Sequence, residues 1–146
     1  VMRLVVQRVK QASVRVNGET ISKIGLGLVT LLGIAKGDTE ATVMKGIKKI
    51  TELRIFEDIN GKMNRALLEV HGENLIISQF TLLADCSEGR RPSFTLAAPP
   101  TEAKHLYEYA IEYSRKLGVS TSTGMFGADM SVELINDGPC TFVLDF

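Results

Sequence analysis

The chain has 146 residues, with 17 basic and 17 acidic side chains and a hydrophobic share of 45%. This length and apolar content suit a single domain, residues 1–146, with one core. The charge balance excludes a global positive field that would draw the protein onto nucleic acid, so any RNA contact must be a local patch.

The first part of the chain is expected to form a β-meander that leads to a central strand. β-Branched residues are frequent up to Val16, and Asn17-Gly18 is a type I′ hairpin signal. The predicted strands cover residues 4–9, 12–16, 19–24 and 28–34. The last of them is apolar throughout, which predicts a strand covered on both faces.

Two amphipathic helices are predicted in the rest of the chain. Between residues 39 and 53 apolar side chains recur at helical spacing, and Asp38 is the expected N-terminal cap. The second helix follows Pro100, with Thr101 as its expected cap and Gly118 as its left-handed end. Each helix therefore has one apolar face with which to cover a sheet.

Further strands are predicted at residues 54–57, 67–70, 74–82, 131–135 and 141–144. Strands and helices in this order indicate a mixed sheet and an α+β fold. The last two strands flank Gly138 and Pro139, and the segment between them, taken alone, is best interpreted as a hairpin turn. The alternative is a rigid turn that aims carbonyl oxygens at a ligand, because glycine and an X-Pro bond permit unusual backbone geometry.

The sequence carries no conventional catalytic set. Its two histidines, His71 and His105, lie in no nucleophile elbow, and Gly25-Leu26-Gly27 precedes a strand pattern rather than a phosphate-binding helix. Metal-binding spacings such as His-Glu-x-x-His and paired Cys-x-x-Cys are absent. We therefore predict no metal and no other cofactor.

The expected location is the cytoplasm. The two cysteines show no disulfide or metal pattern, which favours a reducing compartment. No stretch approaches the roughly 18 uninterrupted apolar residues of a membrane helix. Residues 1–12 carry charges where a signal peptide would need an apolar block.

Residues 78–82 form the first candidate site. Along a strand, Gln79 and Thr81 share one face, and Ser78 and Phe80 share the other. Two polar side chains on one face can meet a small ligand, and backbone N–H groups at a strand end can stabilise an oxyanion. An ordinary half-exposed strand explains the same pattern, and the pattern alone slightly favours it.

Two later segments carry candidate binding residues. Arg90 and Arg91 place two guanidinium groups in a loop, which suits phosphate recognition, and a solvated charged loop fits equally well. Phe126 and Met130 lie in a glycine-containing approach to a strand. They can line a pocket for a planar base or pack in the core.

Short motifs in a fixed order decide between these alternatives. They are Gln7-Arg8-Val9, Ala12-Ser13-Val14, Arg54-Ile55-Phe56, Gly61-Lys62-Met63-Asn64, Ser78-Gln79-Phe80-Thr81-Leu82, Arg91-Pro92-Ser93-Phe94, Thr123-Gly124, Ala128-Asp129-Met130 and Asn136-Asp137-Gly138-Pro139. In sequence and order, over essentially the whole chain, they closely resemble the D-aminoacyl-tRNA deacylases, also called D-tyrosyl-tRNA deacylases. Cys140 is a departure, because many members carry valine there.

The resemblance implies the fold and the activity of that family. The fold is a single α+β domain in which a mixed sheet forms a partial barrel with two helices packed on it. The activity is hydrolysis of the ester that joins a D-amino acid to the 3′ end of tRNA, which is chiral proofreading in translation.

The resemblance also implies a homodimer and a set of site residues. The Gly138-Pro139 turn, with a cis peptide bond, enters the pocket of the partner subunit, and Arg8 anchors the turn. Ser78, Gln79, Phe80 and Thr81 surround the aminoacyl group, and Phe126 and Met130 lie near the terminal adenosine.

An aminoacyl ester is labile, so positioning and oxyanion binding can suffice without an activated nucleophile. We predict hydrolysis assisted by the ribose hydroxyl next to the ester; covalent catalysis by Thr81 is the rival mechanism. Many D-aminoacyl esters and glycyl-tRNA are expected substrates. The alternatives are a non-catalytic dimeric module that binds tRNA 3′ ends and a general esterase that uses Thr81.

Overall fold

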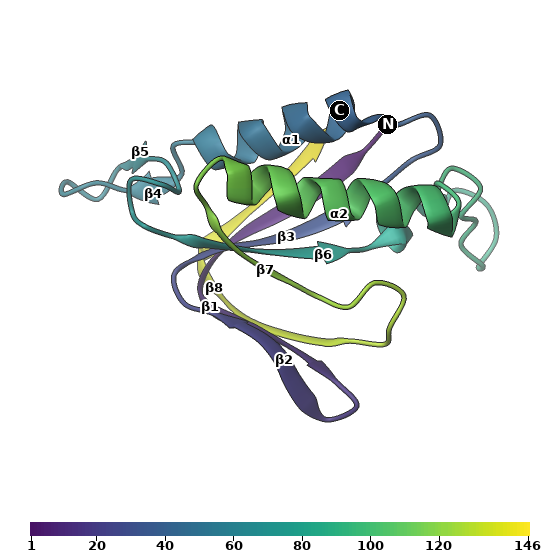
Figure 1. Ribbon diagram of the computed structural model, residues 1–146, viewed down its shortest axis with the longest axis horizontal. Helices are drawn as coiled ribbons and strands as arrows, with labels where there is room; N and C mark the ends of the chain where they lie inside the picture. Colours follow the sequence, from purple (N-terminus) through teal and green to yellow (C-terminus); the bar gives the residue numbers. More distant parts are fainter.

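A mixed sheet forms the frame of the molecule (Figure 1). The computed structural model describes residues 1–146. Its main strands are β1 (Arg3–Val16), β2 (Glu19–Ile24), β3 (Gly27–Gly33), β6 (Glu73–Ser78), β7 (Ser120–Thr123) and β8 (Ser131–Asp145). The long β1 pairs along one edge with β3 and then β2, and along its other edge with β8. The expected α+β fold with a mixed, nearly closed sheet is confirmed.

Two helices cover one face of this sheet, as Figure 1 shows. They are α1 (Glu40–Glu52) and α2 (Pro100–Lys116). The predicted caps are wrong: Thr39, not Asp38, caps α1 by accepting the Thr42 N–H, and Thr101 already lies inside α2. Gly118 ends α2 with a φ of 93°, as expected. Neither helix is long and apolar enough to cross a membrane.

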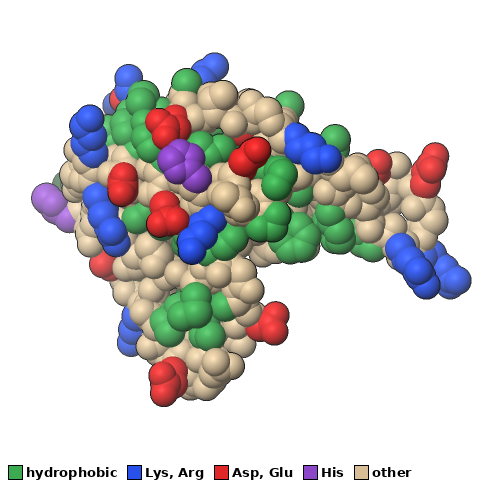
Figure 2. All heavy atoms as spheres, turned by 45° about the vertical axis from the view of Figure 1, so that its right-hand side comes forward, with side chains coloured by type: hydrophobic (Ala, Val, Ile, Leu, Met, Phe, Trp, Pro, Cys, Tyr) green, Lys and Arg blue, Asp and Glu red, His purple; other side chains and the backbone are tan.

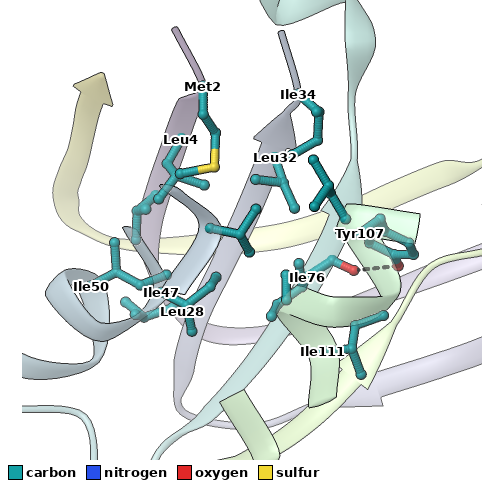
Figure 3. Packing of buried hydrophobic residues seen from close by; sticks show 14 of the residues in the cluster. Met2, Leu4, Leu28, Leu32, Ile34, Ile47, Ile50, Ile76, Tyr107 and Ile111 are labelled. Atoms are coloured by element: carbon teal, nitrogen blue, oxygen red, sulfur yellow. Dashed lines mark hydrogen bonds between the residues drawn. The ribbon is translucent and has the colours of Figure 1, made fainter. Parts of the chain in front are cut away.

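The core lies on both faces of β3. Beneath the helices, Leu28 and Leu32 of β3 and Ile76 of β6 belong to one cluster with Ile47 of α1 and Tyr107 of α2 (Figure 3). A smaller cluster on the opposite face consists of Val9, Ala12, Val14, Ile24, Val29, Leu75 and Ile77. The prediction of a central strand that is covered on both faces is confirmed.

β3 and β6 approach each other closely at Gly27. A Cβ atom at this position would overlap the Glu73 carbonyl oxygen, so alanine forces the two strands apart. We expect Gly27→Ala to lower the free energy of unfolding by about 3 kcal/mol, measured by urea unfolding. Gly25→Ala is the matched control, because its Cβ would lie 3.7 Å from the Glu73 carboxylate. Equal stability of the two variants would contradict this reason for Gly27.

The strand predicted at residues 67–70 is wrong. The Glu69 and Gly72 N–H groups donate to the carbonyl oxygens of Ala66 and Leu67, which makes this segment a series of turns. A short hairpin forms before it instead, from β4 (Phe56–Glu57) and β5 (Met63–Arg65).

The strand predicted at residues 74–82 is correct only up to Ser78. The Gln79 N–H still donates to the Leu32 carbonyl, but the Leu82 N–H then turns back to the Gln79 carbonyl. A 3₁₀ helix, η1 (Phe80–Leu83), therefore follows β6.

The hairpin predicted around Gly138 and Pro139 is also wrong, because β8 is one strand that bulges there. Residues 131–136 and 141–145 of β8 both pair with β1, and the register shifts between them. The Asn136 side chain closes the bulge: it accepts the Cys140 N–H at 2.8 Å and donates to the Cys140 carbonyl at 3.0 Å. The Gly138-Pro139 peptide bond is cis, as the resemblance implies.

Candidate active site

A pocket of about 710 Å³ opens at the carboxyl ends of the parallel strands. Because β3, β6 and β7 run parallel, the loops that follow them gather at one edge of the sheet. Most of the pocket wall is apolar, and its charged or hydrogen-bonding side chains are Lys36, Ser78, Gln79 and Asp129. This size and lining suit a small organic ligand with a few polar groups.

Three of the residues predicted around the aminoacyl group line this pocket. Ser78, Gln79 and Phe80 form part of its wall, whereas Thr81 does not and is exposed. The Gln79 side-chain amide donates a hydrogen bond to the Thr81 hydroxyl. The predicted strand alternation of these two side chains is wrong, and they contact each other in a 3₁₀ turn instead.

The start of η1 leaves two backbone donors free. Its first internal hydrogen bond runs from the Leu82 N–H to the Gln79 carbonyl, so the N–H groups of Phe80 and Thr81 precede it. Gly33 permits this close approach, because a Cβ there would lie 3.2 Å from the Gln79 carbonyl oxygen. Two adjacent free N–H groups can receive an oxyanion.

One wall of the pocket was not expected from the sequence. Phe94 packs edge-on against Phe80, with ring centroids 5.1 Å apart. The loop before Phe94 is closed by paired backbone hydrogen bonds between Asp85 and Ser93. Hydrogen bonds from Ser87 hold the pKa of the Asp85 carboxyl below its usual value. The signal for Phe94 was its place in a motif shared with the deacylases.

Phe126 and Met130 both line the pocket, and their place near the terminal adenosine stays a prediction. The Phe126 ring lies 6.0 Å from that of Tyr107, whose hydroxyl donates to the Ile76 carbonyl at 2.7 Å (Figure 3) and accepts the Gly124 N–H at 3.2 Å. Burial raises the pKa of Tyr107 to about 12. The Tyr107 hydroxyl thus ties the segment that carries Phe126 to β6.

We expect Tyr107→Phe to destabilise the protein by about 1 kcal/mol, because the Ile76 carbonyl and the Gly124 N–H lose their hydrogen bonds to the hydroxyl and keep only the 3.3 Å bond between themselves. The tyrosine also makes stability depend on pH. Its pKa is raised from 10.0 to about 12, so its contribution is complete below pH 10 and is lost as the pH rises toward 12. Chemical unfolding at pH 8, 10 and 11.5 measures this loss. An equally steep loss above pH 10 in Tyr107→Phe would contradict the assignment to Tyr107.

The predicted turn residues lie outside the pocket of their own chain. Gly138 and Pro139 are exposed and line no part of it. Arg8 is 5% exposed and anchors the bulge. Its guanidinium donates to the Asp137 carbonyl at 2.8 Å and to the Ile55 carbonyl at 2.6 Å. The turn is therefore a fixed projection on the surface of the isolated chain.

The basic residues form no broad nucleic-acid surface on the face that Figure 2 shows. Arg90 and Arg91 are exposed and do not line the pocket. Figure 2 shows basic and acidic side chains interspersed over the visible face. This distribution agrees with the balance of 17 basic and 17 acidic residues, and favours recognition by the pocket over recognition by bulk charge.

The chain matches one protein family along nearly its whole length. The family model described as D-Tyr-tRNA(Tyr) deacylase matches residues 5–145. The chain belongs to this family. A relative from Geobacter sulfurreducens, named D-aminoacyl-tRNA deacylase, is 52% identical over 144 residues, which cover 99% of this chain and 95% of the relative. The predicted family and the predicted enzyme class, a hydrolase, are confirmed.

Two solved structures are similar to this member of the family. The c-Myc DNA Unwinding Element Binding Protein superposes with a TM-score of 0.92 at 41% identity, covering 99% of this chain and 98% of that chain. A probable eukaryotic D-amino acid tRNA deacylase superposes with a TM-score of 0.87 at 17% identity, covering 99% of each chain. The second likeness shows the fold alone.

Proposed function

We propose that this pocket hydrolyses the ester between a D-amino acid and the 3′ end of tRNA, releasing free tRNA and the D-amino acid. The observation that carries the proposal is an apolar pocket whose wall includes Phe80, the first residue of η1, where the N–H groups of Phe80 and Thr81 are free. Family membership supplies the substrate class. The reaction removes D-amino acids from tRNA in the cytoplasm before they reach the ribosome.

The substrate brings the reactive groups that the pocket wall lacks. No histidine lines the pocket, so no imidazole base stands there to activate water. Water adds to the ester carbonyl carbon, and the N–H groups of Phe80 and Thr81 hold the developing oxyanion. The bond to the ribose 3′ oxygen then breaks, and the 2′ hydroxyl relays the proton from the water to that oxygen. The chain positions the ester, and the ribose assists the proton transfer.

The lining supports one orientation of the substrate. Phe126 and Met130 offer a flat, polarisable surface to the terminal adenine. Ser78 and Gln79 directly precede η1 on the pocket wall and place the ester beside it. Thr81 acts through its backbone N–H in this arrangement, and its hydroxyl, which accepts from Gln79, is not the nucleophile.

The selection of D-amino acids comes from a second subunit. The Gly138-Pro139 turn is exposed, is anchored from below by Arg8, and lines no part of its own pocket. In the homodimer it enters the partner's pocket, where its carbonyl oxygens pack against the α-carbon of the amino acid. A hydrogen atom fits there, and an L side chain does not. Each active site then consists of residues from both chains.

Because L-amino acids are rejected at the α-carbon, the enzyme discriminates little between different side chains. The enzyme then accepts many D-aminoacyl groups, and it also accepts glycine, which presents only hydrogen atoms to the turn. D-tyrosyl and D-phenylalanyl esters should be hydrolysed at similar rates. A strong preference between these two would contradict selection at the α-carbon.

The direct test is incubation of catalytic amounts of the protein with D-tyrosyl-tRNA and L-tyrosyl-tRNA in parallel. The proposal expects many turnovers of the D ester, with the L ester surviving as long as it does without protein. Equal survival of both esters, together with retained tRNA binding, would indicate that the protein is a non-catalytic module. Equal loss of both would indicate a general esterase.

A further inference from the structure

Lys36 is the one cationic side chain on the wall of the pocket. It is exposed, and no carboxylate lies within ion-pair distance of its ammonium group. The anionic residue of the same wall, Asp129, makes no ion pair with it. The pocket therefore presents one unpaired positive charge to whatever it binds.

The backbone beneath Lys36 is fixed on both sides. Its N–H donates to the Leu96 carbonyl at 3.0 Å, and its neighbour Ala35 forms a β-bridge with Ala97. The Asp38 carboxylate accepts the Ala35 N–H at 2.7 Å and closes the turn. Lys36 thus extends from a rigid platform at the end of β3, which limits the backbone entropy lost when Lys36 binds a ligand.

The surroundings favour an anion over a neutral group. Ala97, Ala98, Pro99 and Pro100 form the apolar wall near this platform and offer no competing acceptor side chain. A lysine ammonium group binds phosphate as a point charge. The substrate of the proposed reaction has one phosphate next to its terminal adenosine, at the 5′ position of that nucleoside.

We propose that Lys36 binds the 5′ phosphate of the terminal adenosine and thereby positions the aminoacyl ester along the pocket. This inference rests on the proposed function. β3 and β6 run parallel with Leu32 beside Ser78, so the loop that carries Lys36 after β3 and the η1 helix after β6 start from the same sheet edge. Lys36 then holds the phosphate while the N–H groups of η1 hold the ester.

The test uses three esters with wild-type protein and the Lys36→Gln variant. They are D-tyrosyl-adenosine, D-tyrosyl-adenosine 5′-phosphate and D-tyrosyl-tRNA. Losing one charge-assisted contact should raise KM about tenfold for the two phosphate-bearing esters and leave KM for D-tyrosyl-adenosine unchanged. The kcat values should not change. Lys36→Arg should restore most of the affinity, because it keeps the charge.

The salt dependence of KM is a second measurement, which a purely structural role of Lys36 would not change. For the tRNA ester, the slope of log KM against log salt should fall by about 0.7 in Lys36→Gln, the value for one phosphate contact on a single strand. Lys48→Gln is the matched control, because Lys48 is exposed on α1 and does not line the pocket. It removes the same charge and should leave the slope unchanged.

The outcomes separate this inference from the proposed function. An equal KM increase for all three esters would place Lys36 at the aminoacyl group and overturn the inference. Unchanged kinetics for all three would overturn it as well. If wild-type protein hydrolyses none of the three esters, the proposed function itself fails.

Discussion

A Gly138→Ala variant is expected to lose at least about a hundredfold in kcat/KM on D-aminoacyl-tRNA. A Cβ atom at this position would lie 2.7 Å from the Cys140 Cβ and 3.0 Å from its Cα, so the turn must move to accept it. Arg8 and the Asn136 side chain hold the flanking backbone in place and concentrate the movement in the turn. Single-turnover deacylation of D- and L-tyrosyl-tRNA measures the loss of rate and of selectivity.

The control for this variant is Cys140→Ala, which changes a neighbouring side chain without adding atoms to the turn. It should keep nearly the full rate, and both variants should show thermal unfolding close to that of the wild type. A Gly138→Ala protein that cleaves the D ester at full rate and still spares the L ester would exclude the turn as the selector.

Mixed dimers show which pocket the turn serves. Gly138→Ala damages the turn, and Ala128→Trp fills the pocket, because Ala128 forms part of its wall. Neither variant should be active alone. If the turn enters the partner's pocket, co-expression restores one intact site in each mixed dimer. No recovery in purified mixed dimers would mean that the turn serves its own chain.

Removal of the substrate's 2′ hydroxyl is the second change with a large expected effect. A tRNA that ends in 2′-deoxyadenosine should be deacylated about a thousandfold more slowly, which is the usual size of a lost proton-transfer group. Thr81→Val should keep a rate near that of the wild type, because its backbone N–H remains. Single-turnover rates at saturating protein separate chemistry from binding.

The rates measured for the two esters must be corrected for the intrinsic reactivity of each ester. The deoxy ester also hydrolyses more slowly without protein, so each rate is divided by the spontaneous rate of the same ester. A Thr81→Val protein that is nearly inactive, combined with normal acceleration of the deoxy ester, would establish Thr81 as the nucleophile instead.

The sequence predicted the elements whose signals are local. The uniform apolar run ending at Ile34 becomes the buried β3, and the helical spacing of Val43, Ile47 and Ile50 becomes the buried face of α1. Asn17-Gly18 has positive φ at both residues, as a type I′ turn requires. Periodicity and turn chemistry were sufficient for these elements.

The errors occurred where distant contacts override local pattern. Residues 80–83 alternate like a strand, but the approach of Gly33 and the turn of the Leu82 N–H back to Gln79 produce η1. The two apolar runs of β8 resemble separate strands because their shared partner, β1, lies at the other end of the chain. Neither contact has a signal in the local sequence.

In the candidate site, too, the residues in local motifs were predicted and those brought in by distant contacts were not. The motifs pointed to Ser78, Gln79, Phe126 and Met130, and all four line one pocket, whereas their roles stay predictions. Phe94 and Lys36 were not expected there, because loops that pair through isolated bridges bring them to the wall. Tyr107 was not singled out in the sequence, and its hydrogen bonds to β6 and Gly124 appear only in the fold.

The central claim is that the pocket rejects L-amino acids by steric exclusion at the α-carbon. It is tested most directly by hydrolysis of D-alanyl, glycyl and L-alanyl esters on one and the same tRNA. We predict that the D-alanyl and glycyl esters are hydrolysed with many turnovers and that the L-alanyl ester is spared. Hydrolysis of the L-alanyl ester at the rate of the glycyl ester would contradict it.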